Sequence, residues 1–489
     1  MSSVTKLSMV ILCMKSPEAL GLLFLPLVEH FPAASKFYSG KMQPQIIMSS
    51  LSSKPNPNRF CCYGCGAELQ FEAPDAAGYV EPDRYALKQR HRQLRQGLCC
   101  RCRALSQGQI LPAVAEGRLR KAGGNGVTSP EELRAQLLPL RERKALVVLL
   151  VDLTDVAGTL LPRVRDLIGA NPVVLVGTKV DLLPKDTDEH AVGQWLAQVG
   201  DARIGGVIDV LVVSAKNGIG MREASNEIRG VRSGRDVFVM GAANVGKSLF
   251  ISAFLEASYA GKPPRLPISS GTPGTTLSPI AIDAFSGGSK LYDTPGVHLQ
   301  HRISTHLLPD ELKVVLPRGR MRPYTPPSPS VVPTTFFWGG LARFDVVTAP
   351  KALRLSFCAF NLRVHSRSTV LADNEYAAQV GRTLTPPLDP ESAEQFGALQ
   401  LRRSVELNVR PMQQAADIAI SGLGWVSVGC LNTLEDTRAA GLLATIDVWV
   451  PRGVEVLVRP PMPIAGLPTA GALSRAIWDG GRPSIQDRG

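Results

Sequence analysis

The feature of this sequence that most constrains its fold is a glycine-rich loop set between a strand and a helix. The loop Gly241-Ala-Ala-Asn-Val-Gly-Lys-Ser248 follows the apolar run Asp236–Met240 and precedes the helical run Leu249–Ala257. Glycines allow the backbone to curl until several N–H groups point inward, and the positive end of the following helix adds to their attraction for phosphate. The order strand, loop, helix therefore predicts a phosphate-binding loop in an α/β domain.

The residues of this loop have separate expected roles. Lys247 is expected to reach the β- and γ-phosphates of a nucleotide, and the Ser248 hydroxyl is expected to bind Mg²⁺. A chance match in a chain with 45 glycines is the alternative, and the strand-then-helix context argues against it. The predicted phosphate-site residues are Gly241, Asn244, Val245, Gly246, Lys247, Ser248 and Leu249.

Two segments downstream of the loop have the composition of nucleotide-dependent switches. In Asp293-Thr-Pro-Gly296 the carboxylate can hold the Mg²⁺ shell through water, and the Gly296 N–H can sense the γ-phosphate. This tetrapeptide alone is a common turn, and its place after the phosphate-binding loop favours a switch. In Pro273-Gly-Thr-Thr276, between the two, we expect Thr276 to offer its hydroxyl to Mg²⁺. The predicted catalytic residues are Lys247, Thr276, Asp293 and Gly296, and the predicted Mg²⁺ ligands are Ser248, Thr276 and Asp293.

Two segments upstream of the loop are suited to recognising guanine. The Asp181 carboxylate, in Thr178-Lys-Val-Asp181, can accept hydrogen bonds from both N1–H and the exocyclic amine of guanine, a pair that adenine cannot supply. Ser214-Ala-Lys216 would place the Ala215 N–H on guanine O6. For each segment the alternative is a polar loop at a strand end. The predicted guanine-site residues are Thr178, Lys179, Asp181, Ser214, Ala215 and Lys216.

The order of these elements predicts a circularly permuted GTPase domain. In an ordinary GTPase the phosphate-binding loop comes first, whereas here Asp181 and Ala215 precede Lys247 and Asp293. A sheet tolerates this order because strand neighbours determine the packing, and chain ends often lie close together. Short apolar runs alternating with helical stretches indicate a mostly parallel sheet with helices on both faces. These runs are Ala145–Val151, Val173–Val176, Val207–Val213 and Val237–Met240.

Two pairs of cysteines predict a zinc site near the N-terminus. Cys62-Tyr-Gly-Cys65 and Cys99-Cys-Arg-Cys102 each resemble a knuckle that gives two thiolates to tetrahedral Zn²⁺. We expect Cys62, Cys65, Cys99 and Cys102 to be the ligands, although a shift of register onto Cys61 or Cys100 stays open. A redox Cys-x-x-Cys pair is the alternative. The nine cysteines in all are too few for a disulfide scaffold of this length.

The charge distribution favours a partner rich in phosphate. The chain carries 54 Lys and Arg against 42 Asp and Glu, a net charge of +12. Between Pro82 and Lys121, ten basic residues face two acids, Asp83 and Glu116. Nucleic acid is the simplest such partner, and a solvated basic surface is the alternative. No apolar run reaches the about 18–20 residues of a membrane-spanning helix.

Changes in composition predict five segments. The N-terminus is poor in acids and rich in Ser, which is typical of an organellar transit peptide, with a secretory signal as the alternative. A stretch rich in Pro, Ser and Arg marks a linker, and short β-favouring runs follow it. The predicted segments are a transit peptide at 1–54, a zinc-finger domain at 55–122, the GTPase domain at 128–316, the linker at 317–333 and a β-rich, RNA-binding C-terminal domain at 334–489.

With these motifs, the chain resembles the YqeH-type circularly permuted GTPases, in particular the chloroplast nitric-oxide-associated group of plants and algae. The resemblance covers about Asn58 to Pro468 and departs from the family at Arg103–Gln109, which lacks an aromatic residue near the second knuckle. Its more specific identifiers are Phe336-Phe-Trp-Gly-Gly340, Leu384-Thr-Pro-Pro387 and Ile420-Ser-Gly-Leu-Gly-Trp425.

The resemblance implies GTP hydrolysis coupled to assembly of a bacterial-type small ribosomal subunit through its rRNA, in the chloroplast stroma or alternatively in the mitochondrion. It also implies slow turnover, because Val297 takes the place of a catalytic Gln. Family members compensate with K⁺, for which Asn244 is the expected ligand; a turn-stabilising amide is the alternative. Two other functions stay open: a GTPase acting on tRNA or at an organellar membrane, and a nitric-oxide-forming oxidoreductase, for which the chain lacks a flavin, nicotinamide or haem-thiolate motif.

Overall fold

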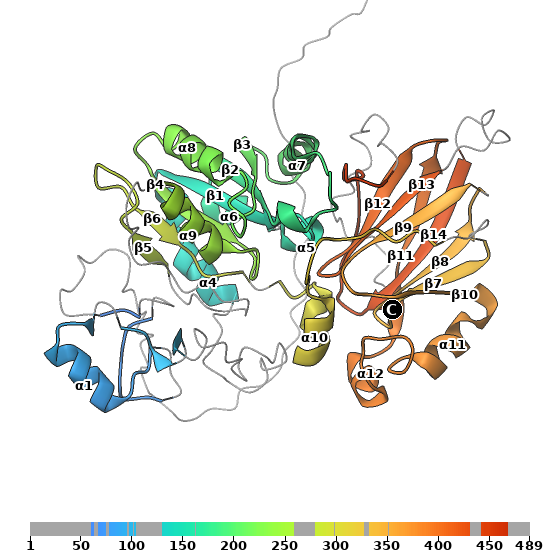
Figure 1. Cartoon of the computed structure of the whole chain (residues 1–489), viewed down its shortest axis with the longest axis horizontal. Helices are drawn as coiled ribbons and strands as arrows, with labels where there is room; N and C mark the ends of the chain where they lie inside the picture. The colour runs from blue at the N-terminus through green and yellow to red at the C-terminus, as the bar shows by residue number, and fades with distance from the viewer. Residues whose placement is uncertain are drawn as a thin grey trace, which may run out of the picture. The chain divides into compact units, whose positions relative to one another are not determined.

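The computed structural model describes residues 60–62, 67–74, 78–94, 97–100, 102–103, 130–161, 163–258, 279–297, 299–326, 332–350, 352–430 and 442–467. All structural statements below concern these residues. All described residues belong to one compact unit of the chain (Figure 1). The predicted transit peptide lies outside the described residues, as do Cys65 and Thr276.

The first large element is a six-stranded sheet in the order β3-β2-β1-β4-β6-β5. All neighbouring strands are parallel except β5 and β6. Strands β1 and β2 are buried along their whole length, as expected for Val- and Leu-rich strands covered on two faces. The predicted α/β fold with a mostly parallel sheet is confirmed. The strands are β1 Ala145–Asp152, β2 Val173–Thr178, β3 Val207–Val212, β4 Asp236–Gly241, β5 Ile280–Ile282 and β6 Leu291–Asp293.

Helices connect these strands and pack against them. The helix that begins within the glycine-rich loop contacts β4 and β6, and a longer helix contacts β2 and β3. The longer helix begins after Asp188, whose carboxylate accepts hydrogen bonds from the His190 and Ala191 N–H groups and so caps the N-terminus. The α-helices are α4 Pro130–Leu137, α5 Val156–Thr159, α6 Arg165–Ile168, α7 Glu189–Arg203, α8 Met221–Val231 and α9 Lys247–Ser258. Short 3₁₀ turns are η3 Leu138–Glu142 and η4 Val180–Leu182.

The C-terminal part consists of two antiparallel sheets that share one core, which confirms the predicted β-rich domain. Their strand orders are β10-β7-β8-β14-β11 and β15-β12-β13-β9. Along β11, Val405, Leu407 and Val409 are buried while Glu406 and Asn408 are exposed, the alternation of a strand with one face on a core. The strands are β7 Thr334–Trp338, β8 Ala342–Thr348, β9 Leu353–Cys358, β10 Val364–Ser368, β11 Leu399–Val409, β12 Gln414–Ile420, β13 Gly424–Cys430, β14 Leu442–Pro451 and β15 Val456–Arg459.

Smaller elements complete the described chain. The N-terminal cysteine region has a core of its own, formed by Cys62, Leu69, Val80, Leu94, Cys99 and Cys102. The remaining helices are α1 Pro82–Arg90, α10 Pro309–Val315, α11 Ala372–Gln379 and α12 Pro390–Phe396, with 3₁₀ turns η5 Ile303–Thr305 and η6 Thr369–Leu371. Among the described residues, no helix is both long and apolar enough to cross a membrane.

A buried cluster joins the six-stranded sheet system to the C-terminal sheets. The Arg459 guanidinium lies between the ring of Trp195 on α7, at 4.9 Å, and the ring of Trp425 on β13, at 4.8 Å. It also pairs with Asp417 at 3.4 Å, and both side chains are at most 1% exposed. We call these four residues the Arg459 clamp. The Trp195 Nε1–H donates to the Pro460 carbonyl at 3.0 Å, so α7 is tied to the end of β15 by a further bond.

The segment expected to be a linker also contacts both parts. Met321 is buried in the GTPase core, and its N–H donates to the Leu182 carbonyl at 2.7 Å. Three residues later, Tyr324 pairs with Phe357 of β9. Part of this segment therefore packs between the two sheet systems, although its Pro and Ser content is typical of a free linker. The domain boundaries stay predictions.

Candidate functional site

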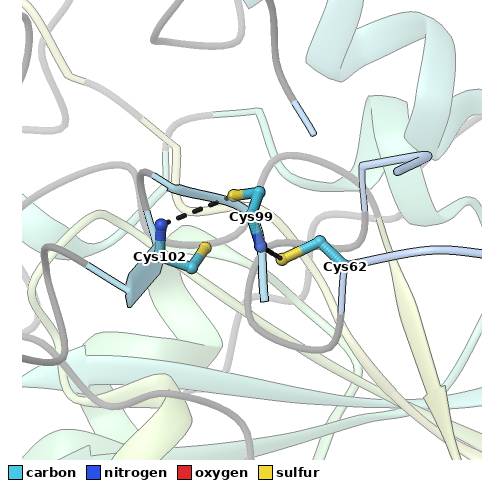
Figure 2. Close-up of side chains that lie close together, drawn as sticks. All are labelled: Cys62, Cys99 and Cys102. Carbon is cyan, nitrogen blue, oxygen red and sulfur yellow. Dashed lines mark hydrogen bonds between the residues drawn. The ribbon is translucent and has the colours of Figure 1, made fainter. Parts of the chain in front are cut away.

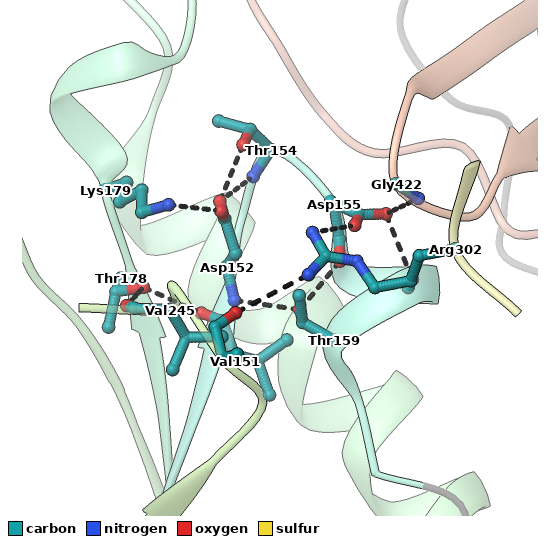
Figure 3. Close-up of polar contacts among 12 residues, drawn as sticks. Val151, Asp152, Thr154, Asp155, Thr159, Thr178, Lys179, Val245, Arg302 and Gly422 are labelled. Atoms are coloured by element: carbon teal, nitrogen blue, oxygen red, sulfur yellow. Dashed lines mark hydrogen bonds and ion pairs between the residues drawn. The ribbon is translucent and has the colours of Figure 1, made fainter. Parts of the chain in front are cut away.

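The predicted site residues gather where the carboxyl ends of the parallel strands meet. β1 lies between β2 and β4, with Asp152 opposite Thr178 and Leu150 opposite Gly241. A side-chain bond joins the two halves directly, because the Thr178 hydroxyl donates to the Val245 carbonyl in the glycine-rich loop at 2.8 Å (Figure 3). The loop predicted to read guanine and the glycine-rich loop, distant in sequence, are therefore neighbours in the fold.

The backbone of the glycine-rich loop needs its glycines for space and for conformation. A Cβ at Gly241 would lie 2.7 Å from the Leu150 carbonyl oxygen, too close for any side chain. Gly246 has a φ of +91°, which side chains rarely adopt. Asn244 has a φ of +66°, in the left-handed region that Asn tolerates better than most residues. The loop thus has the curled form expected of a phosphate cradle.

Lys247 is held inside the loop. Its side-chain ammonium donates to the carbonyls of Ala242 at 3.2 Å and Gly241 at 3.4 Å, and the residue is 8% exposed. Burial lowers its pKa to about 8, and the nearby Asp293 carboxylate opposes this shift. Asp293 itself is fully buried at the end of β6. A buried ammonium inside a loop of this form is suited to receive phosphate.

The pKa of Lys247 predicts how nucleotide affinity depends on pH. The ammonium of the free protein titrates near 8, and bound phosphates would hold its proton and so raise the pKa. The nucleotide affinity is therefore highest below that pH, and it falls by up to about tenfold for each pH unit above it. GDP titrations at about pH 7 and about pH 9 should show the loss, and Lys247→Met should reduce the pH dependence. Equal wild-type affinities at both pH values would contradict the assignment.

The second predicted switch lies against the phosphate-binding loop. A Cβ at Gly296 would lie 3.0 Å from the Lys247 ammonium and 3.1 Å from the Ala243 Cα, so only glycine leaves this approach open. The Ala243 N–H donates to the Val297 carbonyl at 2.9 Å, and the Val297 N–H donates to the Gly241 carbonyl at 3.2 Å. This placement suits a glycine that senses the γ-phosphate. His298 and the first predicted switch with Thr276 lie outside the described residues.

The residues predicted to read guanine lie on two neighbouring loops. Asp181 is half-buried in the middle of η4, the turn that begins directly after Lys179. The φ of Lys179 is +63°. Ser214 is fully buried; its N–H donates to Ile219 at 2.9 Å and its hydroxyl accepts from the Asn217 N–H at 3.2 Å. These bonds shape the loop that carries the predicted residues Ala215 and Lys216. The Val180 N–H donates to the Val213 carbonyl at 3.3 Å and brings the two loops together.

Replacing Asp181 by Asn is expected to weaken GTP binding by about 10²-fold. The charged acceptor is lost, and the amide keeps one acceptor oxygen while it turns an NH2 donor toward the guanine amine. Xanthosine triphosphate should then bind relatively better, since xanthine presents a carbonyl where guanine presents its amine. Competition binding with both nucleotides measures this change. Asp186→Asn, on an exposed Asp just after η4, is the matched control and should leave both affinities unchanged. An unchanged GTP affinity in Asp181→Asn would mean that another residue reads the base.

The Mg²⁺ and K⁺ ligands stay predictions. Oxygen donors of the predicted kind are present: the Asp293 carboxylate is fully buried, and Ser248 stands in the first turn of α9. Mg²⁺ prefers such hard ligands and usually retains several waters. Asn244 is partly buried in the loop, as a K⁺ ligand would need to be.

Three cysteines form a cluster that fits a metal. The sulfurs of Cys62, Cys99 and Cys102 lie within 4.8 Å of one another, and each residue is 1% exposed (Figure 2). The Cys99 N–H points at the Cys62 sulfur at 3.2 Å, and the Cys102 N–H at the Cys99 sulfur at 3.4 Å. Three converging thiols are consistent with the predicted zinc site, whose fourth predicted ligand, Cys65, lies outside the described residues. Cys61 is exposed.

Removal of zinc is expected to unfold the cysteine region while the GTPase sheet stays folded. The core of this region consists of six buried residues, three of which are cysteines of the cluster. Treatment with a chelator should speed amide hydrogen exchange in residues 60–103, and elemental analysis should find about one zinc per chain before treatment. A protein without zinc that contains a reducible disulfide between these cysteines would favour the redox alternative.

Two acids and one arginine beside the site were missed from sequence. Asp152 accepts the Lys179 ammonium at 2.6 Å, and Asp155 pairs with Arg302 at 3.0 Å (Figure 3). Arg302 also approaches the Ala243 carbonyl at 3.5 Å. The one available signal was the pair of Asp residues directly after a buried strand, in Asp152-Leu-Thr-Asp155. Nothing in the sequence pointed to Arg302.

Comparison with known proteins agrees with this geometry. Residues 236–316 match the family model described as 50S ribosome-binding GTPase, and residues 354–462 match the model for the C-terminal part of YqeH-like proteins. The chain is 43% identical over 429 residues to a protein of Oryza sativa subsp. japonica described as a putative nitric oxide synthase, covering 83% of this chain and 78% of that protein. It is 41% identical over 430 residues to the NO-associated protein 1, chloroplastic/mitochondrial, of Arabidopsis thaliana, covering 83% and 76%.

A bacterial relative is covered almost completely. The chain is 31% identical over 400 residues to the YqeH protein of Bacillus subtilis, covering 81% of this chain and 98% of that protein. The matched family models include the glycine-rich loop, the second switch and most of the C-terminal sheets. The chain is therefore a GTPase and belongs to the YqeH-like family.

Proposed function

We propose that this GTPase is a nucleotide-controlled assembly factor for the small subunit of a bacterial-type ribosome, bound through its rRNA in the plastid stroma. The observation that carries the proposal is the bonded path between the nucleotide site and the C-terminal sheets. A switch that regulates assembly needs such a path, because the state of the γ-phosphate must alter a distant binding surface.

The main-chain part of this path is short. Val297 is bonded to the phosphate-binding loop, and the Ile303 N–H donates to the Ser421 carbonyl, in the turn between β12 and β13, at 2.8 Å. Residues 297–303 are therefore fixed to the nucleotide site at one end and to the C-terminal sheets at the other. A displacement of Gly296 on γ-phosphate binding would pass into this short segment, which supports transmission to the C-terminal sheets.

The side-chain part of the path runs through Asp155. One carboxylate oxygen pairs with Arg302, and the other accepts the Gly422 N–H at 3.1 Å and the Gly158 N–H at 3.0 Å (Figure 3). Gly422 has a φ of +81°, and a Cβ there would lie 3.0 Å from the Arg302 Cβ. The turn therefore approaches Arg302 as closely as a glycine allows, which favours a direct mechanical response.

Hydrolysis at this site is expected to be slow. Val297 stands where a glutamine would orient the attacking water, and its side chain packs against the apolar core of the GTPase sheet. An apolar side chain offers water no hydrogen bond, so the residues of this chain supply positioning and charge through Lys247 and the backbone N–H groups of the loop. Bound Mg²⁺, and K⁺ near Asn244, would supply the remaining positive charge. Slow turnover suits a checkpoint better than a motor.

The partner and the compartment are inferred from charge and from the relatives. A net charge of +12 favours binding to rRNA, and ten of the basic residues fall in the segment around the cysteine cluster. The Arabidopsis relative is described as chloroplastic/mitochondrial, and the description of the matched GTPase model refers to ribosome binding. The model's description specifies the 50S subunit, so the choice of the small subunit needs a direct test.

Sedimentation of plastid ribosomal particles separates these possibilities. With a non-hydrolysable GTP analogue, the protein should move with small-subunit particles; with GDP it should remain near the top of the gradient. Arg302→Ala is expected to keep GTP binding but to reduce this nucleotide dependence, and Lys313→Ala, at an exposed ion pair on α10, is the matched control. Movement with large-subunit particles, or sedimentation at the top with every nucleotide, would contradict the proposal. Crosslinking to tRNA in preference to rRNA would favour the tRNA alternative.

A further inference from the structure

Asp152 is a buried carboxylate that no predicted motif includes, and it stands inside the nucleotide site. It is the last residue of β1, the strand between the guanine-reading strand β2 and the phosphate-binding strand β4. Its register partner is Thr178. It is 5% exposed, and a buried charge is retained only where its partners make up for the lost water. Those partners indicate what the residue does.

The two oxygens of Asp152 have different partners. One accepts the Thr154 N–H at 2.9 Å and the Thr154 hydroxyl at 2.6 Å, so the orientation of the carboxylate is fixed by its own loop. The other accepts the Lys179 ammonium at 2.6 Å. Burial alone would raise the pKa of Asp152. The charge and the hydrogen bond of Lys179, together with the two hydrogen bonds from Thr154, lower this pKa overall. The Lys179 ammonium and the Thr154 donors thus favour the ionised form of the carboxylate.

Lys179 needs such a partner in order to hold one conformation. A lysine side chain has four flexible carbons and a strongly hydrated head, and on an open loop it would take many rotamers. Here the backbone of Lys179 is left-handed, with φ +63°, and its side chain is 28% exposed. A positive φ at a residue other than glycine persists only where the surrounding structure holds it, and such residues are common at functional sites. The ion pair with Asp152 is the contact that directs the side chain across the site.

The frame around this pair is rigid. The Thr178 hydroxyl bonds to the Val151 carbonyl at 3.1 Å and to the Val245 carbonyl at 2.8 Å, which ties β2 both to β1 and to the phosphate-binding loop. The ammonium of Lys179 is therefore held from β1, and its backbone from β2. The stem of the lysine therefore runs from the end of β2 toward the end of the neighbouring strand β1.

We propose that Asp152 is a positioning residue of the guanine site, whose carboxylate holds the Lys179 ammonium so that the lysine stem is already in place to cover one face of the base. Fixing a flexible side chain before the ligand arrives removes the cost of ordering it from the binding step. Asp152 touches no reacting atom. Its contribution is the same for GDP and GTP, because both carry the same base.

A double-mutant cycle on nucleotide affinity tests the inference. With a fluorescent N-methylanthraniloyl derivative of GDP, Asp152→Asn is expected to weaken binding by about tenfold, and Lys179→Met by a similar factor. The nucleotide affinity of the double variant should be no more than about twofold below that of the single variant that binds more weakly. The reason is that each change removes the same contact. GTP affinity should fall by the same factor while kcat stays within about twofold, the pattern of lost uniform binding.

Asp236→Asn is the matched control. Asp236 begins β4, at the opposite end of the sheet from the nucleotide site, and its carboxylate accepts the Lys290 N–H at 2.9 Å. This change removes a comparable charge from the same sheet and should leave nucleotide affinity within about twofold. If Asp152→Asn proves too unstable to titrate, Thr154→Val removes the hydroxyl bond to the fixed oxygen but keeps the backbone N–H bond and the charge, and should weaken binding by about threefold.

Three results would overturn the inference: unchanged or tighter GDP binding in Asp152→Asn, losses that multiply in the double variant, or a fall in kcat without a change in affinity. Tighter binding would mean that Asp152 draws Lys179 away from the base. The inference rests on the prediction that Lys179 and Asp181 contact guanine, which Asp181→Asn tests independently. Because the cycle uses no ribosomal particle, it can succeed or fail irrespective of the proposed role in assembly.

Discussion

Replacing Lys247 by Ala should lower kcat/KM for GTP hydrolysis by about 10³-fold, the largest effect on activity that we expect. The ammonium is 8% exposed and lies inside the phosphate-binding loop, where charge acts with little screening by water. As the bond to the γ-phosphoryl group breaks, negative charge develops on the leaving β-phosphate oxygens. Loss of this cation therefore raises the barrier as well as weakening binding. Single-turnover hydrolysis at saturating protein separates the two losses.

The control for this measurement is Lys290→Ala. Lys290 lies just before β6, and its ammonium pairs with Asp283 at 3.1 Å in a partly exposed position away from the loop. Its loss should leave kcat/KM within about twofold, because exposed ion pairs contribute little. A Lys247→Ala protein that retains more than about a tenth of wild-type activity would show that the assignment of the phosphate site is wrong.

Removing Arg459 should cause the largest loss of stability. In Arg459→Ala the free energy of unfolding is expected to fall by about 3–5 kcal/mol, because Asp417 is left buried without its counter-charge and two indole rings lose their packing partner. Denaturant unfolding followed by tryptophan fluorescence measures the change, since Trp195 and Trp425 are members of the Arg459 clamp. Both the GTPase sheet and the C-terminal sheets contribute to the clamp.

The loss should depend on pH in a defined direction. In the wild type, burial raises the pKa of Asp417 to about 6 even though Arg459 opposes the shift. Without Arg459 the pKa would rise further, so the folded variant holds a proton that the unfolded chain has released. In the variant, the contribution of Asp417 to the free energy of unfolding then continues to fall as the pH rises above 6. In the wild type the same contribution levels off there. The deficit of Arg459→Ala is therefore expected to be larger at about pH 8 than at about pH 6.

The double variant Arg459→Met with Asp417→Asn is the control for charge. It removes both charges and keeps an apolar side chain between the indole rings, so it should recover much of the lost stability and show a weaker pH dependence. The idea fails if Arg459→Ala lowers the free energy of unfolding by less than about 1 kcal/mol, or by the same amount at both pH values. Either result would mean that the clamp is a packing contact without a buried ion pair.

Several features of the site could be predicted because they are local. Three motifs consist of adjacent residues, and each stands at the end of a strand whose apolar residues are visible in the sequence. They are the glycine-rich loop Gly241–Ser248, the turn Asp293–Gly296 and the segment Thr178–Asp181. Parallel strands bring their carboxyl ends to one edge, so placing the strands already places the motifs together. For the same reason the permuted order did not obscure the site.

Other features could not be predicted because they join residues far apart. Arg302 and Asp155 are 147 positions apart, and Gly422 reaches the same carboxylate from 267 positions away. Neither Arg302 nor Asp155 belongs to a motif. From sequence alone, an arginine near a switch is expected to be exposed to solvent. Arg459 is a stronger case, since an arginine in a short strand gives no sign that it is 1% exposed between two tryptophans.

The sequence by itself determined the nature and the order of the nucleotide-binding loops, the α/β and β-rich parts and the cysteine pairs, because turn chemistry and side-chain periodicity act over a few neighbouring residues. The tertiary structure alone decided which charges meet: Lys179 with Asp152, Arg302 with Asp155, and Arg459 with Asp417. A buried charge must find its partner wherever packing brings one within reach, and that distance depends on the whole fold.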